Sequence, residues 1–177
     1  MDFRILHYDA LDSTNDQAIF FAREGAQEGT VVATEFQKKG RGRFERTWLS
    51  PRGKGLLFSL ILRPKLRTFQ APILTHWAAE AVLESLVSNY GLKAKLKKPN
   101  DVLVRDKKIC GILTESSAVK QKLDYVIVGI GLNVNSTKKD LLDSATSIFM
   151  ETKKKVEKEP LMLDILEYFR TQYEKAQ

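Results

Sequence analysis

Strand-like segments that follow one another closely limit the fold of this chain more than any other feature of its sequence. In the second half of the chain, residues 93–97, 101–116 and 122–135 are apolar or alternate between apolar and polar side chains. Short turns can join antiparallel strands, whereas parallel strands need a crossover of roughly a dozen residues or more. The pattern therefore predicts antiparallel pairing, with a hairpin bend at residues 105–107.

The remaining sequence adds three strands and three helices to this prediction. β-branched or apolar runs predict further strands at residues 3–9, 29–36 and 55–63. Helical patterns cover residues 11–25, 71–91 and 159–176. The predicted fold class is therefore α+β, with a mixed, mostly antiparallel sheet and helices packed on it.

Capping signals mark the ends of the predicted helices. In the first helix, Thr14 and Gln17 have the spacing of a capping box, and Ser13 and Asp12 are the other candidate N-caps. Either Gly25 or Gly29 is expected to end this helix. Gly91 closes the second helix. In the third, the apolar residues at helical spacing are Leu163, Leu166, Phe169 and Tyr173.

Length and composition predict one domain over residues 1–177, with residues 136–158 as a linker to a C-terminal helix at 159–176. No apolar run approaches the roughly 20 residues of a membrane span, and the N-terminus lacks a signal-peptide pattern. The single cysteine, Cys110, excludes an internal disulfide and favours a reducing cytoplasm. Because it lies in an apolar stretch, Cys110 is expected to be a small buried side chain rather than a nucleophile.

A long cationic segment, "KKGRGRFERTWLSPRGKG" (residues 38–55), separates two predicted strands. It could be a disordered connector, a patch for nucleic acid, or a loop that closes over an anionic ligand. Its glycines let backbone N–H groups approach a ligand, and its arginines suit carboxylate and phosphate groups. The net charge of +7 permits a nucleic-acid or phosphate partner. The length and composition favour a lid that a bound phosphate would order.

Three other segments can carry chemistry, although each has a simpler structural explanation. Asp101 and Lys108 lie on the two arms of the predicted hairpin, which suits a nucleotide site or, more simply, a solvated surface. Gly129 and Gly131 allow another backbone or a ligand to approach the strand closely, and the side-chain amide of nearby Asn133 could form hydrogen bonds with an adenine ring. The segment "DSTN" (residues 12–15) could solvate a polar group or simply cap a helix.

Taken together and in this order, these segments resemble the catalytic domain of biotin–protein ligases, also called biotin–[acetyl-CoA-carboxylase] ligases. The family shows D-S-T-N, Q-x-x-G-R-G-R-x-x-R-x-W-x-S-P, K-W-P-N-D, K-x-x-G-I-L-x-E and G-x-G-x-N. The corresponding segments here are "DSTN" (12–15), "QKKGRGRFERTWLSP" (37–51), "KKPND" (97–101), "KICGILTE" (108–115) and "GIGLN" (129–133). The resemblance implies a fold like that of class II aminoacyl-tRNA synthetases and biotin synthetases.

The resemblance also implies roles for individual residues. The residues implied in biotin binding are Ser13, Thr14, Asn15, Gln37, Gly40, Arg41, Gly42, Arg43, Lys108, Gly111, Ile112 and Gly129. Those implied in binding ATP or the adenylate are Arg43, Arg46, Trp48, Asp101, Lys108 and Asn133. Lys108 and Arg43 are the implied catalytic residues, and Asp101 would position Mg²⁺ that enters with ATP.

The implied reaction has two steps and an acceptor protein. Biotin is activated by ATP to biotinyl-5′-AMP, and a lysine of a biotin carboxyl carrier protein domain then takes the biotin. A homodimer is compatible with the family, whereas membrane association is not expected. Only about ten residues precede "DSTN", too few for a winged helix-turn-helix, so DNA binding is not expected either. The chain also ends before the small C-terminal β-barrel that many members carry.

Two other functions fit part of the sequence. Lipoate–protein ligases share the implied fold and adenylate chemistry but normally lack the arginine–glycine block. Alternatively, the chain could bind biotin or its adenylate without transferring it, because Lys98 replaces the tryptophan of the family's K-W-P-N-D motif. Nucleic-acid binding is less favoured, since few aromatic residues beyond Phe44 and Trp48 lie among the basic residues.

Overall fold

A computed structural model describes residues 1–44 and 46–176 of the chain. Its seven strands are β1 (Arg4–Tyr8), β2 (Thr30–Thr34), β3 (Gly55–Leu62), β4 (Ala94–Lys97), β5 (Asp101–Val104), β6 (Lys107–Val119) and β7 (Lys122–Asn133). Its α-helices are α1 (Thr14–Arg23), α2 (Pro72–Tyr90), α3 (Ile148–Thr152) and α4 (Lys158–Lys175). Two short 3₁₀ helices, η1 (Thr68–Gln70) and η2 (Lys138–Asp140), complete the described elements.

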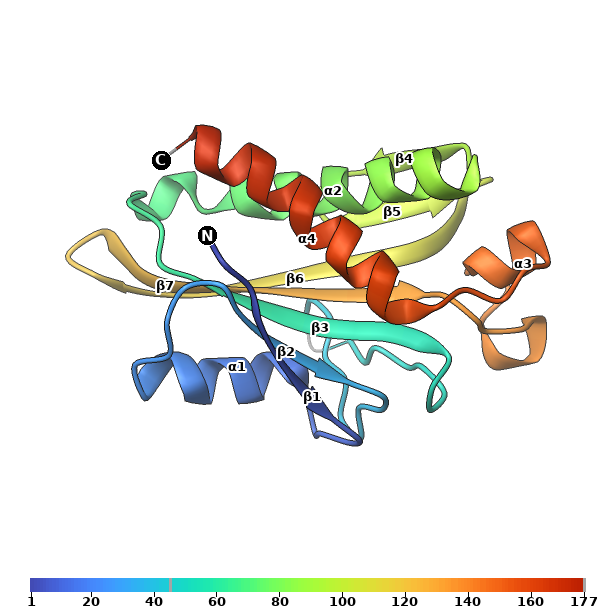
Figure 1. Cartoon of the computed structure of the whole chain (residues 1–177), viewed down its shortest axis with the longest axis horizontal. Coiled ribbons are helices and arrows are strands. Elements are labelled where there is room, and N and C mark those ends of the chain that lie inside the picture. Colours follow the sequence, from blue (N-terminus) through green and yellow to red (C-terminus); the bar gives the residue numbers. More distant parts are fainter. Residues whose placement is uncertain (45, 177) are drawn as a thin grey trace.

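All seven strands form one sheet in the order β1-β2-β3-β7-β6-β5-β4 (Figure 1). β1 pairs with β2 in parallel, and every other neighbouring pair is antiparallel. The β5–β6 bend falls at Arg105 and Asp106, both with positive φ, as the sequence predicted. The prediction of a mixed, mostly antiparallel sheet in an α+β fold is confirmed.

Helices cover both faces of the sheet (Figure 1). The larger core lies on the α2 and α4 side and includes Phe58, Leu74 and Leu166. The smaller core lies under α1, where Ala18 and Ala22 pack against Val32, Ile61 and Ile127. Because α1 covers only part of its face, the rest of that face is open to the loops that follow β2 and β7.

The start of α1 differs in part from the sequence prediction. Ser13, rather than Thr14, is the N-cap, and its side chain accepts a hydrogen bond from the backbone N–H of Asp16. Thr14 is therefore free for other contacts. The helix ends at Arg23, and Gly25 follows in a left-handed conformation with φ of +85°.

The C-terminal helix also differs in one position. Leu166, Phe169 and Tyr173 are buried, as predicted, but Leu163 is 45% exposed. The other buried residues of α4 are Leu161, Met162 and Ile165. Leu163 therefore lies beside the buried stripe, which passes through Met162 and Ile165 in this part of α4.

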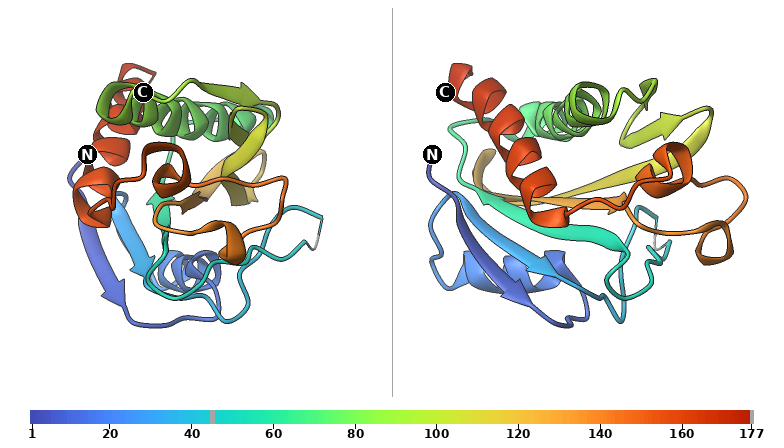
Figure 2. Two further views of the ribbon diagram at one scale, coloured as in Figure 1. Left: turned by 90° about the vertical axis from the view of Figure 1, so that its right-hand side faces the viewer. Right: turned by 45° about the vertical axis from the view of Figure 1, so that its right-hand side comes forward.

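The segment expected to be a linker, residues 136–158, contains η2 and α3 and is folded against the end of the sheet (Figure 2). Ser147 caps α3, and Thr146, Ser147 and Ile148 are fully buried. Ala145 forms a parallel bridge with Lys108 of β6. This packing places the segment beside the site described below.

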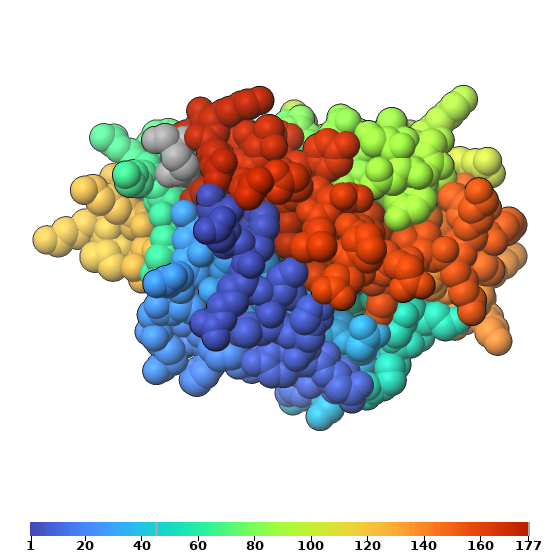
Figure 3. Space-filling view, in the orientation of Figure 1, coloured from blue at the N-terminus to red at the C-terminus, as the bar shows by residue number. Residues whose placement is uncertain are grey.

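The two ends of the described chain lie close together (Figure 3). The N-terminal amino group forms an ion pair with Glu174 of α4, and Tyr173 of the same helix donates a hydrogen bond to Glu28. Among the described residues, none of the helices is both long and apolar enough to cross a membrane.

Candidate active site

Three glycines leave the centre of the α1 face of the sheet without side chains. In the strand register, Gly129 of β7 lies between Ser59 of β3 and Leu113 of β6. Two residues on, Gly131 of β7 lies opposite Gly111 of β6. Directly opposite residues in antiparallel strands project to the same face, so the three glycines form one patch. We call Gly111, Gly129 and Gly131 the glycine floor.

Two side chains, Trp48 from the loop after β2 and Asn15 from the first turn of α1, rest directly on the glycine floor. A Cβ atom at Gly131 would lie 2.6 Å from Cε2 of the Trp48 ring, and one at Gly111 would lie 3.1 Å from the same ring. A Cβ atom at Gly129 would overlap Oδ1 of Asn15. Glycine is therefore required at residues 129 and 131 for this packing.

One end of the floor is a buried polar network. The Oε1 atom of Gln37 accepts hydrogen bonds from the backbone N–H (2.8 Å) and the hydroxyl (3.0 Å) of Thr14. Ser59 Oγ lies 2.8 Å from Thr14 Oγ1 and 2.6 Å from Asn15 Oδ1. Thr14, Asn15 and Ser59 are all nearly inaccessible to solvent. The hydroxyl and amide groups at this end are therefore held in fixed positions by one another.

The other end of the floor is cationic. Lys108 Nζ lies 2.7 Å from Oδ1 of Asp101 and 5.4 Å from the centre of the Trp48 ring. The sequence prediction that Asp101 and Lys108 pair across one hairpin is confirmed. Nearby on β7, Asn133 donates to the backbone oxygen of Thr146 (3.0 Å), while its buried Oδ1 has no partner among the described residues. That oxygen is an acceptor available to an amino group.

The arginine loop, residues 38–48, folds as a tight hairpin at the edge of the floor. The Trp48 N–H donates to the Gly40 carbonyl (2.9 Å), and the Gly42 N–H donates to the Arg46 carbonyl (2.6 Å). Gly40 must be glycine here, because a Cβ atom would collide with the backbone oxygen of Trp48. These bonds hold Trp48 over the sheet. Glu45 of this loop lies outside the described residues.

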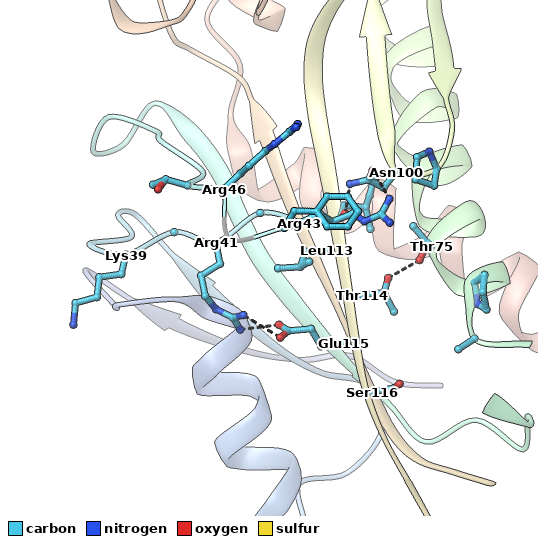
Figure 4. Close-up of a pocket in the computed structure, with 18 of the residues that line it drawn as sticks. Lys39, Arg41, Arg43, Arg46, Thr75, Asn100, Leu113, Thr114, Glu115 and Ser116 are labelled. Atoms are coloured by element: carbon cyan, nitrogen blue, oxygen red, sulfur yellow. Dashed lines mark hydrogen bonds and ion pairs between the residues drawn. The ribbon is translucent and has the colours of Figure 1, made fainter. Parts of the chain in front are cut away.

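The three arginines of the loop lie in different surroundings (Figure 4). Arg41 is held by Glu115, with bonds of 3.0 and 2.7 Å, and by Asp16 at 2.6 Å. Arg43 donates to the side-chain oxygen of Asn100 (3.3 Å) and lies over the ring of Phe44. Arg46 is exposed and forms no ion pair with the described residues. Arg43 and Arg46 therefore keep positive charge available for an anion.

Two cavities meet at the arginine loop. The outer one, of about 1150 Å³, lies between the loop, the start of α2, the turn at Pro99–Asn100 and residues 112–116 of β6. The inner one, of about 60 Å³, lies on the glycine floor under Trp48. The inner space holds only a few waters, so a bicyclic ligand on the floor requires Trp48 or the loop to move.

The structure brings most of the predicted site residues together. Those that line the inner cavity are Ser13, Thr14, Asn15, Gln37, Arg41, Gly42, Arg43, Trp48, Lys108, Gly111, Ile112 and Gly129. Gly40 and Arg46 line the outer cavity instead. Asp101 and Asn133 line neither cavity, although Asp101 contacts Lys108 directly.

Sequence reasoning missed three residues of the site. Asn100 binds Arg43, Glu115 binds Arg41, and Ser59 joins the polar network. Gly131 was expected to allow close approach within its strand, and the Trp48 ring lies against it. Asn100 and Glu115 were part of quoted motifs, and this could have marked them as site residues. Ser59 carried none, because a serine in an apolar strand says nothing about its partners.

Local electrostatics fix the charge state of two groups. The pKa of Arg41 is raised, mainly by its hydrogen bonds to Glu115 and further by the negative charges of Glu115 and Asp16. Partial burial acts in the opposite direction but does not cancel this increase. Arg41 therefore stays cationic at any physiological pH. Burial raises the pKa of the Cys110 thiol far above its ordinary value. The thiol is therefore protonated and unreactive, which agrees with the predicted structural role of Cys110.

The described residues do not form a metal cage. They contain no group of three His, Cys, Asp or Glu side chains that could hold an ion. Asp101 is a single carboxylate, and it is already paired with Lys108. Mg²⁺ commonly binds through one or two carboxylates together with substrate phosphates. Asp101 fits this limited role, and no step below depends on it.

Solved structures that share this fold define the class of protein. A biotin protein ligase from Aquifex aeolicus in complex with biotin and ATP superimposes with a TM-score of 0.81 and 32% identity. The match covers 97% of this chain and 71% of that one. The fold is thus that of the biotin protein ligases, and the expectation of a class II synthetase-like fold is confirmed.

Sequence comparison gives the family. Residues 8–133 match the Biotin/lipoate A/B protein ligase family, and this chain belongs to it. The bifunctional ligase/repressor BirA of Bacillus subtilis is 38% identical over 98% of this chain and 54% of its own length. The biotin–[acetyl-CoA-carboxylase] ligase of Paracoccus denitrificans is 40% identical over 70% of this chain and 51% of its own length. The chain thus spans about half the length of these curated relatives.

Proposed function

We propose that this chain activates biotin with ATP to form biotinyl-5′-AMP and transfers the biotin to a lysine of a biotin carrier protein domain. We also propose that residues 1–177 work as one catalytic unit in the cytoplasm. Two relatives named biotin–[acetyl-CoA-carboxylase] ligase align with 70% and 77% of this chain, and the solved biotin protein ligase from Aquifex aeolicus aligns with 97% of it. Among the family's two substrate classes, these names favour biotin over lipoate.

One observation carries the proposal: the glycine floor runs between a polar network and a cationic end. A ligand lying on the floor would place a polar ring at Thr14 and Gln37 and an acidic tail at Lys108. Biotin has this layout, with a ureido ring at one end and a carboxylate at the other. The polar network is buried, so its groups are already oriented and ligand binding requires little further ordering.

The cationic end suits the first step. The biotin carboxylate attacks the α-phosphorus of ATP, an acyl–phosphate bond forms, and pyrophosphate leaves with the electrons of the broken P–O bond. Lys108 would stabilise the negative charge where carboxylate and α-phosphate meet, and Asp101 holds that lysine in place. Arg43 and Arg46 would add positive charge from the loop. Asn133 Oδ1 would accept a hydrogen bond from the adenine amino group.

The arginine loop suits the second step. The carrier lysine attacks the acyl carbon of the anhydride, an amide forms, AMP leaves, and the amine loses a proton. The anhydride must be kept from water until then. A loop that places Trp48 on the glycine floor without a ligand can place it on a nucleotide ring when one is bound. Mg²⁺, if it enters with ATP, would neutralise phosphate charge beside Asp101.

A single assay tests the proposal. Purified chain is mixed with ATP, Mg²⁺, labelled biotin and a biotin-carrier domain, and pyrophosphate and labelled carrier are measured. We expect biotin-dependent pyrophosphate release and label on the carrier. Biotin-dependent pyrophosphate without labelled carrier would remove the transfer step from the proposal. Binding of biotin without pyrophosphate would leave a binding module, and activity with lipoate in place of biotin would indicate the other substrate class.

A further inference from the structure

Arg41 is the only arginine of the loop whose charge is compensated by carboxylates among the described residues. Its Nη1 and Nη2 atoms both donate to Glu115, and Nη2 also donates to Asp16. In Figure 4 its side chain turns toward Glu115, whereas Arg43 points toward Asn100. An anionic ligand at Arg41 would have to displace two carboxylates, so Arg41 is poorly suited to bind one.

Glu115 is bound from a second side. Its Oε2 atom accepts a hydrogen bond from Nδ2 of Asn15 (2.7 Å) as well as from Arg41 (2.7 Å). The other contacts of Asn15 are to the backbone oxygen of Leu113 and to Ser59. Every polar atom of the Asn15 side chain is therefore occupied by the protein. Asn15 supports the site and has no free donor for a ligand.

One carboxylate of β6 thus joins two parts of the site that are distant in sequence. Through Arg41 it fixes the start of the arginine loop, and through Asn15 it fixes the start of α1, where Thr14 meets Gln37. Glu115 is 29% exposed and Arg41 38% exposed. A bidentate pair that is open to water is specific in geometry but moderate in strength. Such a pair can release the loop and recapture it.

We propose that Glu115 is a positioning residue that sets the arginine loop and the polar end of the glycine floor relative to each other. Arg41 and Asn15 are its two partners. The expected effect of Glu115 on substrate binding rests on the proposed function, whereas its effect on the position of the loop does not. Loss of the Glu115 carboxylate should weaken biotin binding more than ATP binding, because Arg43, Lys108 and Asn133 do not contact it.

The test compares Glu115→Gln with Glu24→Gln, which removes the same charge from an exposed position at the C-terminal end of α1. Without any ligand, trypsin cleavage within residues 38–46 is followed by mass spectrometry. Cleavage in Glu115→Gln is expected to be about tenfold faster than in wild type. Glu24→Gln should behave as wild type, and thermal unfolding should show that both variants are folded.

The kinetic readout uses biotin-dependent pyrophosphate release. In Glu115→Gln, KM for biotin should rise about tenfold while KM for ATP changes less than about threefold. Arg41→Lys, which keeps the charge and the trypsin site but loses the bidentate geometry, should fall between wild type and Glu115→Gln. This graded order would not follow from a merely structural role.

Two results would overturn the inference. One is cleavage of Glu115→Gln at the wild-type rate, and the other is an equal rise in KM for both substrates. If the wild-type chain releases no biotin-dependent pyrophosphate, the proposed function fails instead. The cleavage comparison still tests Glu115 in that case, because it needs no substrate.

Discussion

At the scale of single residues, the proposed chemistry depends most on Lys108. Its amine lies at the glycine floor, 3.1 Å from where a Cβ atom at Gly111 would be, and it contacts Asp101 and the Trp48 ring. In the strand register, its neighbour Lys107 lies beside the β5–β6 turn and is exposed. The two lysines therefore offer a matched pair of substitutions.

We predict that Lys108→Ala lowers the rate of biotinyl-5′-AMP formation at least about a hundredfold, because one stabilising group for the developing charge is lost. The free energy of unfolding should fall by only about 1 kcal/mol, since the ion pair is partly exposed. Lys107→Ala should leave both quantities unchanged. Acid-quenched single-turnover assays and chemical denaturation measure them. Activity of Lys108→Ala within twofold of wild type would refute its assignment, where twofold is roughly 0.4 kcal/mol.

Residue types could be predicted from sequence, but their partners could not. The order of motifs pointed to Thr14, Gln37, Lys108 and Asn133, and the structure places the first three at one cavity. The pairing of Arg41 with Glu115, 74 residues apart, was not foreseeable because it depends on how the loop folds back. A charged side chain gives no sign in the sequence whether another residue or a ligand will neutralise it.

At the scale of elements, hydrophobic periodicity located strands and long helices well. It was least reliable in the segment between β7 and α4, whereas the predicted helix at 159–176 agrees with α4 to within one residue at each end. The short helix α3 has only five residues, too few for a periodic signal, and it is held by the Ser147 cap and by burial of Ile148. Tertiary packing, rather than local preference, determines such elements.

The unequal burial of two leucines of α4 leads to a stability prediction. Leu166 is 1% exposed and Leu163 is 45% exposed. Leu166→Ala should lower the free energy of unfolding by about 2–5 kcal/mol, because it removes buried contacts and leaves a cavity. Leu163→Ala should cost less than about 1 kcal/mol. Equal losses for the two variants in urea denaturation would show that α4 packs differently.

At the scale of the whole molecule, the sheet collects segments that are far apart in the chain. Residues 13–15, 37–48, 100–115 and 129–133 meet on one face because β7 lies between β3 and β6. The class of fold followed from the sequence, since closely spaced strands favour antiparallel pairing. The strand order and the glycine register did not, because many orders satisfy the same local patterns.

The same arrangement gives the site its means of closing. The glycine floor belongs to the sheet, whereas the arginine loop is attached through a few hydrogen bonds, the exposed Lys39–Asp12 ion pair and the partly exposed ion pairs of Arg41. With Trp48 in place, the inner cavity holds about 60 Å³. We therefore predict that substrate binding begins with movement of the loop and ends with its return over the adenylate.

Protection of the arginine loop by substrates tests this account most directly. Trypsin cleavage within residues 38–50 is measured with no ligand, with biotin alone, with ATP alone and with both at saturation in Mg²⁺. We predict that biotin and ATP together slow cleavage about tenfold or more, because the loop must open before the protease can act and the adenylate holds it closed. Identical cleavage in all four conditions would contradict the account.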